Sequence, residues 1–301
     1  MTEIREPSSI IEMAESIKRR FEYALASGDI DKMGTEDSPE PIPPRARAQM
    51  ICDVLPDVDY YELDKDFADS VSEVFENDFN NKSMDDFYFS MDYRLPSPTC
   101  AFWAKGTLTQ YGDQKFPYMY IAQEETTGDG KIRVDIYMVS PYFLGNYIGA
   151  YVLEEQGPLL LPTHVMADYH GKQNHATRVV TVAITCSLIN QPNFVLREAA
   201  GTRQQRRAVA RSGGFSQATW SKVRWNVGEA VRQRLERDEP VRCMPLHYTR
   251  GHWRRGHEHW TDAVQRSDGG WYKWIDGYWS GHPAFGIRKA VHEPRIKEQV
   301  A

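Results

Sequence analysis

The first regular pattern of apolar positions lies near the N-terminus, at the spacing of one helix face. The residues that make this pattern are Ile10, Met13, Ile17, Phe21 and Ala24. The spacing predicts an amphipathic helix over residues 9–27. Ser9 stands three residues before Glu12, as in a capping box, and Gly28 supplies the C-terminal stop.

The next stretch is acidic and rich in proline over residues 29–44, which predicts an exposed linker. A short helix is expected over 45–54. A second helix is expected over 67–79, where apolar residues again recur at helical spacing.

From residue 86 the apolar pattern changes to short, β-rich runs separated by Gly, Pro and Asp. The predicted strands are 87–89, 100–104, 118–123, 132–139 and 147–153. Residues 178–189 are rich in β-branched side chains and predict a further strand.

The C-terminal part begins with a basic helix expected over 202–211, sequence TRQQRRAVAR. The elements expected after it are a strand at 220–227, a short helix at 228–237, and strands at 245–254, 270–279 and 287–293. Strands cluster rather than alternate with long helices, which favours an α+β fold with antiparallel sheets. We expect an acidic helical segment over 1–84, a β-rich core domain over 85–195, and a basic helix with a small β-module over 196–301.

Charge is unevenly distributed along the 301 residues, whose net charge is −6. Residues 1–160 hold 14 Lys and Arg against 30 Asp and Glu, whereas residues 161–301 hold 22 against 12. In the basic half Arg outnumbers Lys 17 to 5, and Arg is the residue suited to bidentate contact with phosphate. This asymmetry predicts a polyanion partner or attraction between the halves.

Membrane insertion and secretion are not expected. The longest apolar run, near Val179–Ile189, is interrupted by Thr181, Thr185 and Ser187. The first residues are charged where a signal peptide would become apolar. The four cysteines form no CxxC pair and are expected to be free thiols in the cytoplasm.

The densest group of functional side chains lies at 245–260, sequence PLHYTRGHWRRGHEHW, with more aromatic residues at 271–285. Arginines here and in the basic helix would bind phosphates while exposed rings stack bases. The predicted nucleic-acid-binding residues are Arg203, Arg206, Arg207, Arg211, Arg250, Arg254, Arg255 and Trp253. The competing interpretation is a small module whose aromatic side chains form its own core.

A metal site is the second interpretation of the same segment. Its candidate ligands are His252, His257, His259 and His282. The spacings of zinc proteases and zinc deaminases are absent, and so are nucleophile-elbow, P-loop and dinucleotide-binding motifs. No cofactor is expected, no catalytic residue is predicted, and a metal-dependent hydrolase ranks last among the functions considered.

The acidic segment has a functional alternative of its own. Acidic residues over 45–54 and 67–79 could imitate a phosphate backbone and occupy a DNA-binding host or defence protein. A solvated helical surface is the ordinary explanation of such a charge pattern.

Several motifs resemble uncharacterised proteins encoded in phage and prophage genomes of proteobacteria. These motifs are PLHYTRGHWRR, WIDGYWSGHPAFGIRK, LPSPTCAFW at 95–103 and SLINQPN at 187–193. The resemblance implies a phage-associated setting and assigns no catalytic residue. We therefore expect a non-enzymatic phage-type accessory protein that binds nucleic acid or a nucleoprotein, with the inhibitor of a host protein as the alternative.

Overall fold

The computed structural model describes residues 6–32, 43–78, 93–111, 114–142, 146–154, 157–159, 172–211, 215, 219–227, 233, 237, 245–249, 252–275 and 278–287. The chain divides into two compact units. Unit 1 comprises Met1–Phe75 and Met91–Asn226, and unit 2 comprises Glu76–Ser90 and Val227–Ala301.

Unit 1 is built around a mixed β-sheet. Its strands, in spatial order, are β8 (Gly157–Leu159), β7 (Asn146–Glu154), β6 (Ile132–Val139), β5 (Met119–Thr126), β2 (Thr99–Ala104), β1 (Asp59–Leu63), β10 (Trp220–Trp225) and β9 (Val195–Ala199). Strand β1 pairs in parallel with both β2 and β10, while the other neighbours are antiparallel. A short hairpin, β3 (Leu108–Tyr111) with β4 (Gln114–Pro117), forms a separate ladder.

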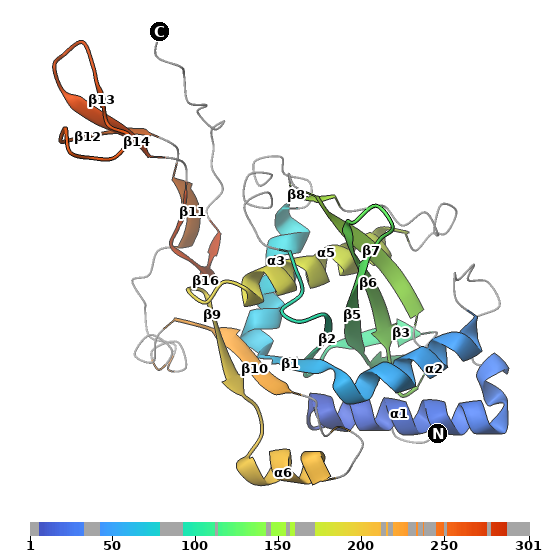
Figure 1. Ribbon diagram of the computed structural model, residues 1–301. Helices are drawn as coiled ribbons and strands as arrows, with labels where there is room; N and C mark the ends of the chain where they lie inside the picture. The colour runs from blue at the N-terminus through green and yellow to red at the C-terminus, as the bar shows by residue number, and fades with distance from the viewer. Residues whose placement is uncertain are drawn as a thin grey trace. The chain divides into compact units, whose positions relative to one another are not determined.

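Two N-terminal helices cover one face of this sheet, as Figure 1 shows. They are α1 (Ile10–Ser27) and α2 (Pro44–Val54). The apolar face of α1 is buried as its spacing predicts, against sheet residues that include Tyr60, Ala101 and Tyr137. Ser9 caps α1 by accepting a hydrogen bond from the Glu12 backbone N–H, and Gly28 ends it in the left-handed conformation.

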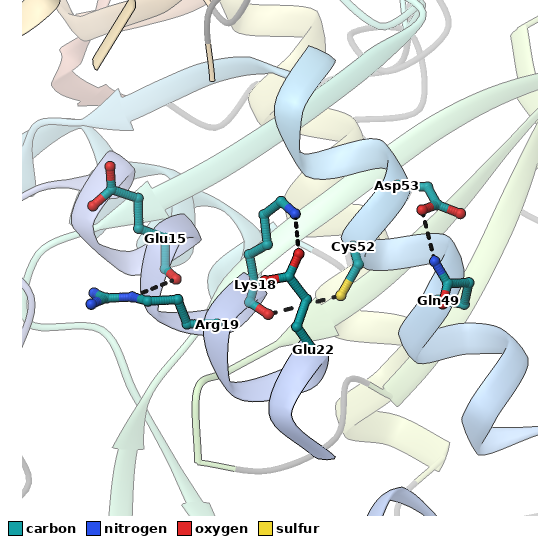
Figure 2. Close-up of polar contacts among 7 residues, drawn as sticks. All are labelled: Glu15, Lys18, Arg19, Glu22, Gln49, Cys52 and Asp53. Carbon is teal, nitrogen blue, oxygen red and sulfur yellow. Dashed lines mark hydrogen bonds and ion pairs between the residues drawn. The ribbon is translucent and has the colours of Figure 1, made fainter. Parts of the chain in front are cut away.

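Figure 2 shows polar contacts within α1, within α2 and between the two helices. Lys18 forms an ion pair with Glu22 one turn away, and Gln49 Nε2 donates a hydrogen bond to Asp53 Oδ1 at 2.9 Å. The Cys52 thiol donates to the Lys18 carbonyl oxygen at 3.9 Å, which joins the two helices. The acidic residues Glu22 and Asp53 therefore have partners on their own helices.

The opposite face of the sheet carries α5 (Lys172–Ile189), and this corrects the strand predicted over 178–189. From Val179 to Ile189 nearly every side chain is buried. A helix that is covered on almost all sides loses the 3.6-residue alternation of apolar and polar positions. Its Val, Ile and Thr residues then resemble a strand in sequence.

The other helices of the described chain are α3 (Lys65–Asp78) and α6 (Arg203–Arg211), with 3₁₀ turns at Asp29–Lys32 and Leu55–Asp57. Both helices lie within a residue or two of their predicted positions. The predicted linker begins with a 3₁₀ turn, in which Ile30 is buried. The sequence pattern does not predict strands β1 and β9. Strand β1 lies inside the sheet, and the adjacent residues Tyr60 and Tyr61 are both buried. Its sequence therefore lacks the alternation of apolar and polar residues that identifies a half-buried strand.

Unit 2 contains two small sheets. One has the order β15 (Tyr278–Ser280), β11 (Pro245–Thr249), β16 (His282–Ile287), and the other has β12 (His252–Gly256), β14 (Trp271–Ile275), β13 (Val264–Gln265). The predicted strands 245–254 and 270–279 are each divided into two, because the halves of each belong to different sheets.

The α+β fold class is confirmed, with the difference that the main sheet is mixed. The predicted strand at 87–89, most of the helix at 228–237 and most of the strand at 287–293 lie outside the described residues. The three-segment division stays a prediction; its boundary after residue 195 falls at the first residue of β9, inside unit 1.

Candidate functional site

The basic helix α6 belongs to unit 1 and begins with a capping box. Thr202 Oγ1 accepts a hydrogen bond from the Gln205 N–H at 3.2 Å, and Gln205 Oε1 accepts one from the Thr202 N–H at 2.7 Å. Gly201 precedes the cap at φ 68°, and a Cβ there would lie 2.4 Å from the Trp220 ring. The start of α6 is therefore fixed against the main sheet.

The four predicted arginines of α6 are all exposed, but they differ in what they contact. Arg206 turns back and donates to the carbonyl oxygens of Ala200 and Gly201, at 3.4 and 3.3 Å. Arg203, Arg207 and Arg211 recur every four residues along one stripe of the helix, and their side chains make no ion pair or hydrogen bond within the described chain. We name these three residues the arginine stripe.

In unit 2, antiparallel pairing brings aromatic and cationic side chains to one face of the sheet β12–β14–β13. Trp253 lies opposite Trp274, Arg255 opposite Tyr272, and Val264 also opposite Tyr272. Directly paired residues share a face. We name the face formed by Trp253, Arg255, Val264, Tyr272, Trp274 and the adjoining Arg266 the aromatic face.

Arg266 is the central cation of the aromatic face. Its guanidinium lies 4.4 Å from the Trp253 ring centroid and 5.2 Å from that of Tyr272. Its Nε is buried without a hydrogen-bond acceptor, and the side chain forms no ion pair with any residue that the structure describes. A stacked guanidinium without an acceptor is suited to bind an anionic or planar ligand.

The rings of this sheet do not form a closed core. Trp253, Trp274 and Tyr272 are half-buried, and Trp253 and Trp274 meet edge to face with centroids 5.4 Å apart. Every described side chain of β12, β13 and β14 is half-buried or exposed. The aromatic side chains therefore stay accessible on a thin sheet.

Asp268 lies beside the aromatic face and already has partners. It accepts hydrogen bonds from the Tyr272 hydroxyl at 2.6 Å and from the Gly270 N–H at 2.9 Å. The bond from Tyr272 is the main reason why the pKa of Asp268 is lowered, and the same bond raises the pKa of Tyr272. The carboxylate is thus held in its charged form as an acceptor for Tyr272.

Arg254 lies on the reverse face of the same sheet, because adjacent residues of a strand point to opposite sides. Its guanidinium stacks over the Trp260 ring at 5.6 Å. Trp260 in turn packs on the backbone of Gly256, where a Cβ would come within 2.4 Å of the ring. The structure therefore separates Arg254 from Arg255 and Trp253, although the three are neighbours in sequence.

The candidate metal ligands are not brought together. His257 and His259 lie in the turn after β12, and the side chains of Glu258 and His259 are 61% and 84% exposed. His282 lies on β16 of the other sheet, tilted against Phe285, and His252 is exposed on β12. Within the described ranges no three His, Cys, Asp or Glu residues lie close enough to hold a metal ion.

A partly buried polar cluster in unit 1 is closed on itself. Arg133 donates to Asp135 Oδ1 at 2.8 Å and to the Tyr147 hydroxyl oxygen at 2.8 Å, and the Tyr147 hydroxyl donates to the same carboxylate at 2.8 Å. Burial is the main cause that raises the pKa of Tyr147. Each member has a partner within the cluster, which is the arrangement of a structural network.

Sequence reasoning does not single out Arg266 or Tyr272. Arg266 follows β13 in a segment that the sequence predicts as a connection, and only the register of β13 on β14 places it over Trp253. Arg250 lies outside the described residues.

No protein-family model and no curated protein sequence matches this chain. In the part of the chain that the structure describes, none of the helices is both long enough and apolar enough to cross a bilayer.

Proposed function

We propose that this protein is a non-enzymatic accessory protein that binds single-stranded nucleic acid through the aromatic face of unit 2. The observation that carries the proposal is the Arg266 guanidinium, stacked on Trp253 and Tyr272, whose Nε has no acceptor among the described residues. Arg guanidinium planes and aromatic rings both stack on unpaired bases, and cations beside them bind phosphates.

Single strands fit this face better than a duplex does. Stacking on a sheet surface requires bases that are free on one side, which a duplex does not offer. Arg255 is exposed next to Tyr272 on the same face and supplies a second cation for the backbone. The arginine stripe of α6 in unit 1 is a separate group of cations suited to phosphate contact.

The two alternatives draw less support. A metal-dependent hydrolase needs a ligand set that the described histidines do not form. The inhibitor hypothesis needs available acidic groups over 45–54 and 67–79, whereas Asp53 of the first segment already accepts a hydrogen bond from Gln49 on the same helix. A phage-associated setting and a cytoplasmic location complete the proposal; the buried free thiols Cys52, Cys100 and Cys186 are consistent with a reducing compartment.

The test is fluorescence anisotropy with labelled oligothymidine, oligouridine and a duplex of equal length, at several salt concentrations. We expect tighter binding to the single strands. Arg266→Gln and Arg255→Gln should each weaken binding and lower the log–log salt slope by about 0.7 for each phosphate that the variant no longer neutralises.

Arg254→Gln is the matched control, because Arg254 is on the same strand but on the reverse face. It should leave affinity and slope unchanged. Circular dichroism establishes that each variant is folded. Binding that is insensitive to salt and to both aromatic-face substitutions would refute the proposal.

A further inference from the structure

Unit 1 contains a cavity of about 190 Å³ between the sheet, α3 and α5. It lies on the face of the sheet that α5 covers. The residues that line it are Leu63, Ala68, Val71, Phe102, Trp103, Ala104, Thr107, Tyr118, Tyr120, Arg178, Thr181, Val182 and Thr185. These residues include a single cationic side chain, that of Arg178, and none of them carries a carboxylate.

Arg178 is half-buried and has no anionic partner among the residues that the structure describes. Its Nη1 donates to the thioether sulfur of Met138 at 2.8 Å, and its Nη2 donates to Thr109 Oγ1 at 3.2 Å. Its guanidinium also lies 5.8 Å from the Tyr118 ring centroid. A thioether is a weak acceptor, and no carboxylate of the described residues pairs with this charge. A guanidinium removed from water favours an anion in the space beside it.

Two tyrosine hydroxyl groups belong to the same lining, and the Tyr118 ring lies beside the Arg178 guanidinium. The Tyr120 hydroxyl donates to the Tyr118 hydroxyl oxygen at 3.4 Å, which leaves the Tyr118 proton free to donate to a ligand. Burial raises the pKa of Tyr120 well above its ordinary value, so this phenol stays protonated. The Thr185 hydroxyl, farther along α5, already donates to the carbonyl oxygen of Thr181 one turn earlier.

Much of the remaining lining is apolar. Phe102 on β2, Ala68 and Val71 on α3, and Val182 on α5 are hydrocarbon side chains among the lining residues. An engineered cavity of about 150 Å³ in another protein accepts benzene. The space here therefore suits one ring or a branched group of similar size, with a charged substituent directed to Arg178.

We propose that this cavity binds a small monocarboxylate with an apolar body, on the scale of benzoate, and that Arg178 holds its carboxylate. Arg binds carboxylates through two parallel N–H donors, and the Tyr118 hydroxyl supplies a third. The residues that line the cavity all belong to unit 1, so they are not part of the aromatic face of unit 2.

The experiment is isothermal titration calorimetry of the full chain with benzoate, benzyl alcohol and inorganic phosphate at neutral pH. Benzoate should bind saturably and about 10- to 100-fold more tightly than benzyl alcohol, since a hydrogen bond to a charged group contributes about 1.5–3 kcal/mol. Arg178→Met should abolish this preference for the carboxylate.

A second variant keeps the test decisive where Arg178→Met fails to fold. Ala68 on α3 is half-buried and lines the cavity, so Ala68→Leu adds carbon atoms to the space that the ligand would occupy. This variant should prevent benzoate binding while leaving the fold intact. Three outcomes would each overturn the proposal. They are tighter binding of phosphate than of benzoate, undiminished benzoate binding in both variants, and the absence of benzoate binding by the folded wild-type chain.

Discussion

At the residue scale, unit 1 keeps its ionisable thiols away from water. Cys52, Cys100 and Cys186 are buried and free, and Cys100 lies 3.3 Å from the Ser97 hydroxyl. Burial is the main cause that raises the pKa of Cys52 to about 11 and that of Cys100 to about 12. The folded state therefore favours the protonated, neutral thiol.

These thiols predict a loss of stability in alkaline solution. In the unfolded chain a thiol ionises near its ordinary pKa of 9.0, while in the folded chain Cys100 keeps its proton up to about 12. The free energy of unfolding should therefore be full below pH 9 and should fall as the pH rises toward 12. Each such group contributes about 1.4 kcal/mol per pH unit across its window. Urea unfolding followed by far-UV circular dichroism at pH values on both sides of 9 measures the fall.

The control for this prediction is the variant Cys100→Ala. The quantity to compare with wild type is the slope of the free energy of unfolding against pH, rather than the free energy itself. Removing the thiol should flatten the pH dependence above 9, even if the variant is less stable at neutral pH. An unchanged slope would show that Cys100 is not among the groups responsible.

At the scale of elements, amphipathic segments could be predicted from the sequence and fully covered ones could not. Helix α1 has one buried face, so its apolar spacing and Ser9 cap identify it directly. Helix α5 is covered on almost all sides, and its β-branched residues wrongly predict a strand. Strand β1 is not predicted for a related reason. Two adjacent tyrosines are both buried in this central strand, so apolar and polar residues do not alternate along it.

The candidate site shows the same division. Trp253 and Arg255 could be identified from composition alone, because Trp and Arg are concentrated in that segment. The partnership of Arg266 with Trp253 depends on the register of β12, β13 and β14, which are separated by turns. Side-chain composition predicts which residues are suited to binding, but strand pairing decides which of them share a face.

The arginine stripe of α6 gives a prediction at this scale. Arg207→Ala removes a guanidinium that has no partner in the described chain, whereas Arg206→Ala removes one that is tied to the carbonyls of Ala200 and Gly201. If the stripe contacts phosphates, Arg207→Ala should lower the salt slope for single strands by about 0.7 and Arg206→Ala should leave it unchanged. The two variants have the same charge and lie on adjacent residues, so net charge cannot explain a difference. Equal effects would show that α6 acts only through net charge.

At the scale of the whole molecule, the division of the sequence into an acidic first half and a basic second half does not carry over to the folded units. In unit 2, residues 227–301 hold 13 Lys and Arg against 10 Asp and Glu, and residues 76–90 hold 1 against 4. Unit 2 is therefore neutral, and unit 1 carries the entire net charge of −6. Affinity for nucleic acid must then come from local groups, the aromatic face and the arginine stripe, rather than from a basic half.

The same partition predicts which fragments of the chain can fold, and this bears on the inhibitor hypothesis. A fragment of residues 1–160 lacks α5, β9 and β10, so β1 would lose one of its two parallel partners and one face of the sheet would lose α5. It should show no cooperative urea transition, while a fragment of residues 1–226, which retains every strand of the main sheet, should unfold cooperatively. Circular dichroism of both fragments measures this.

The acidic half could then act as a phosphate mimic only as part of unit 1, and the 1–226 fragment is the bait for testing that. If residues 1–160 fold alone and displace DNA from a captured protein, the inhibitor hypothesis would replace nucleic-acid binding as the leading function.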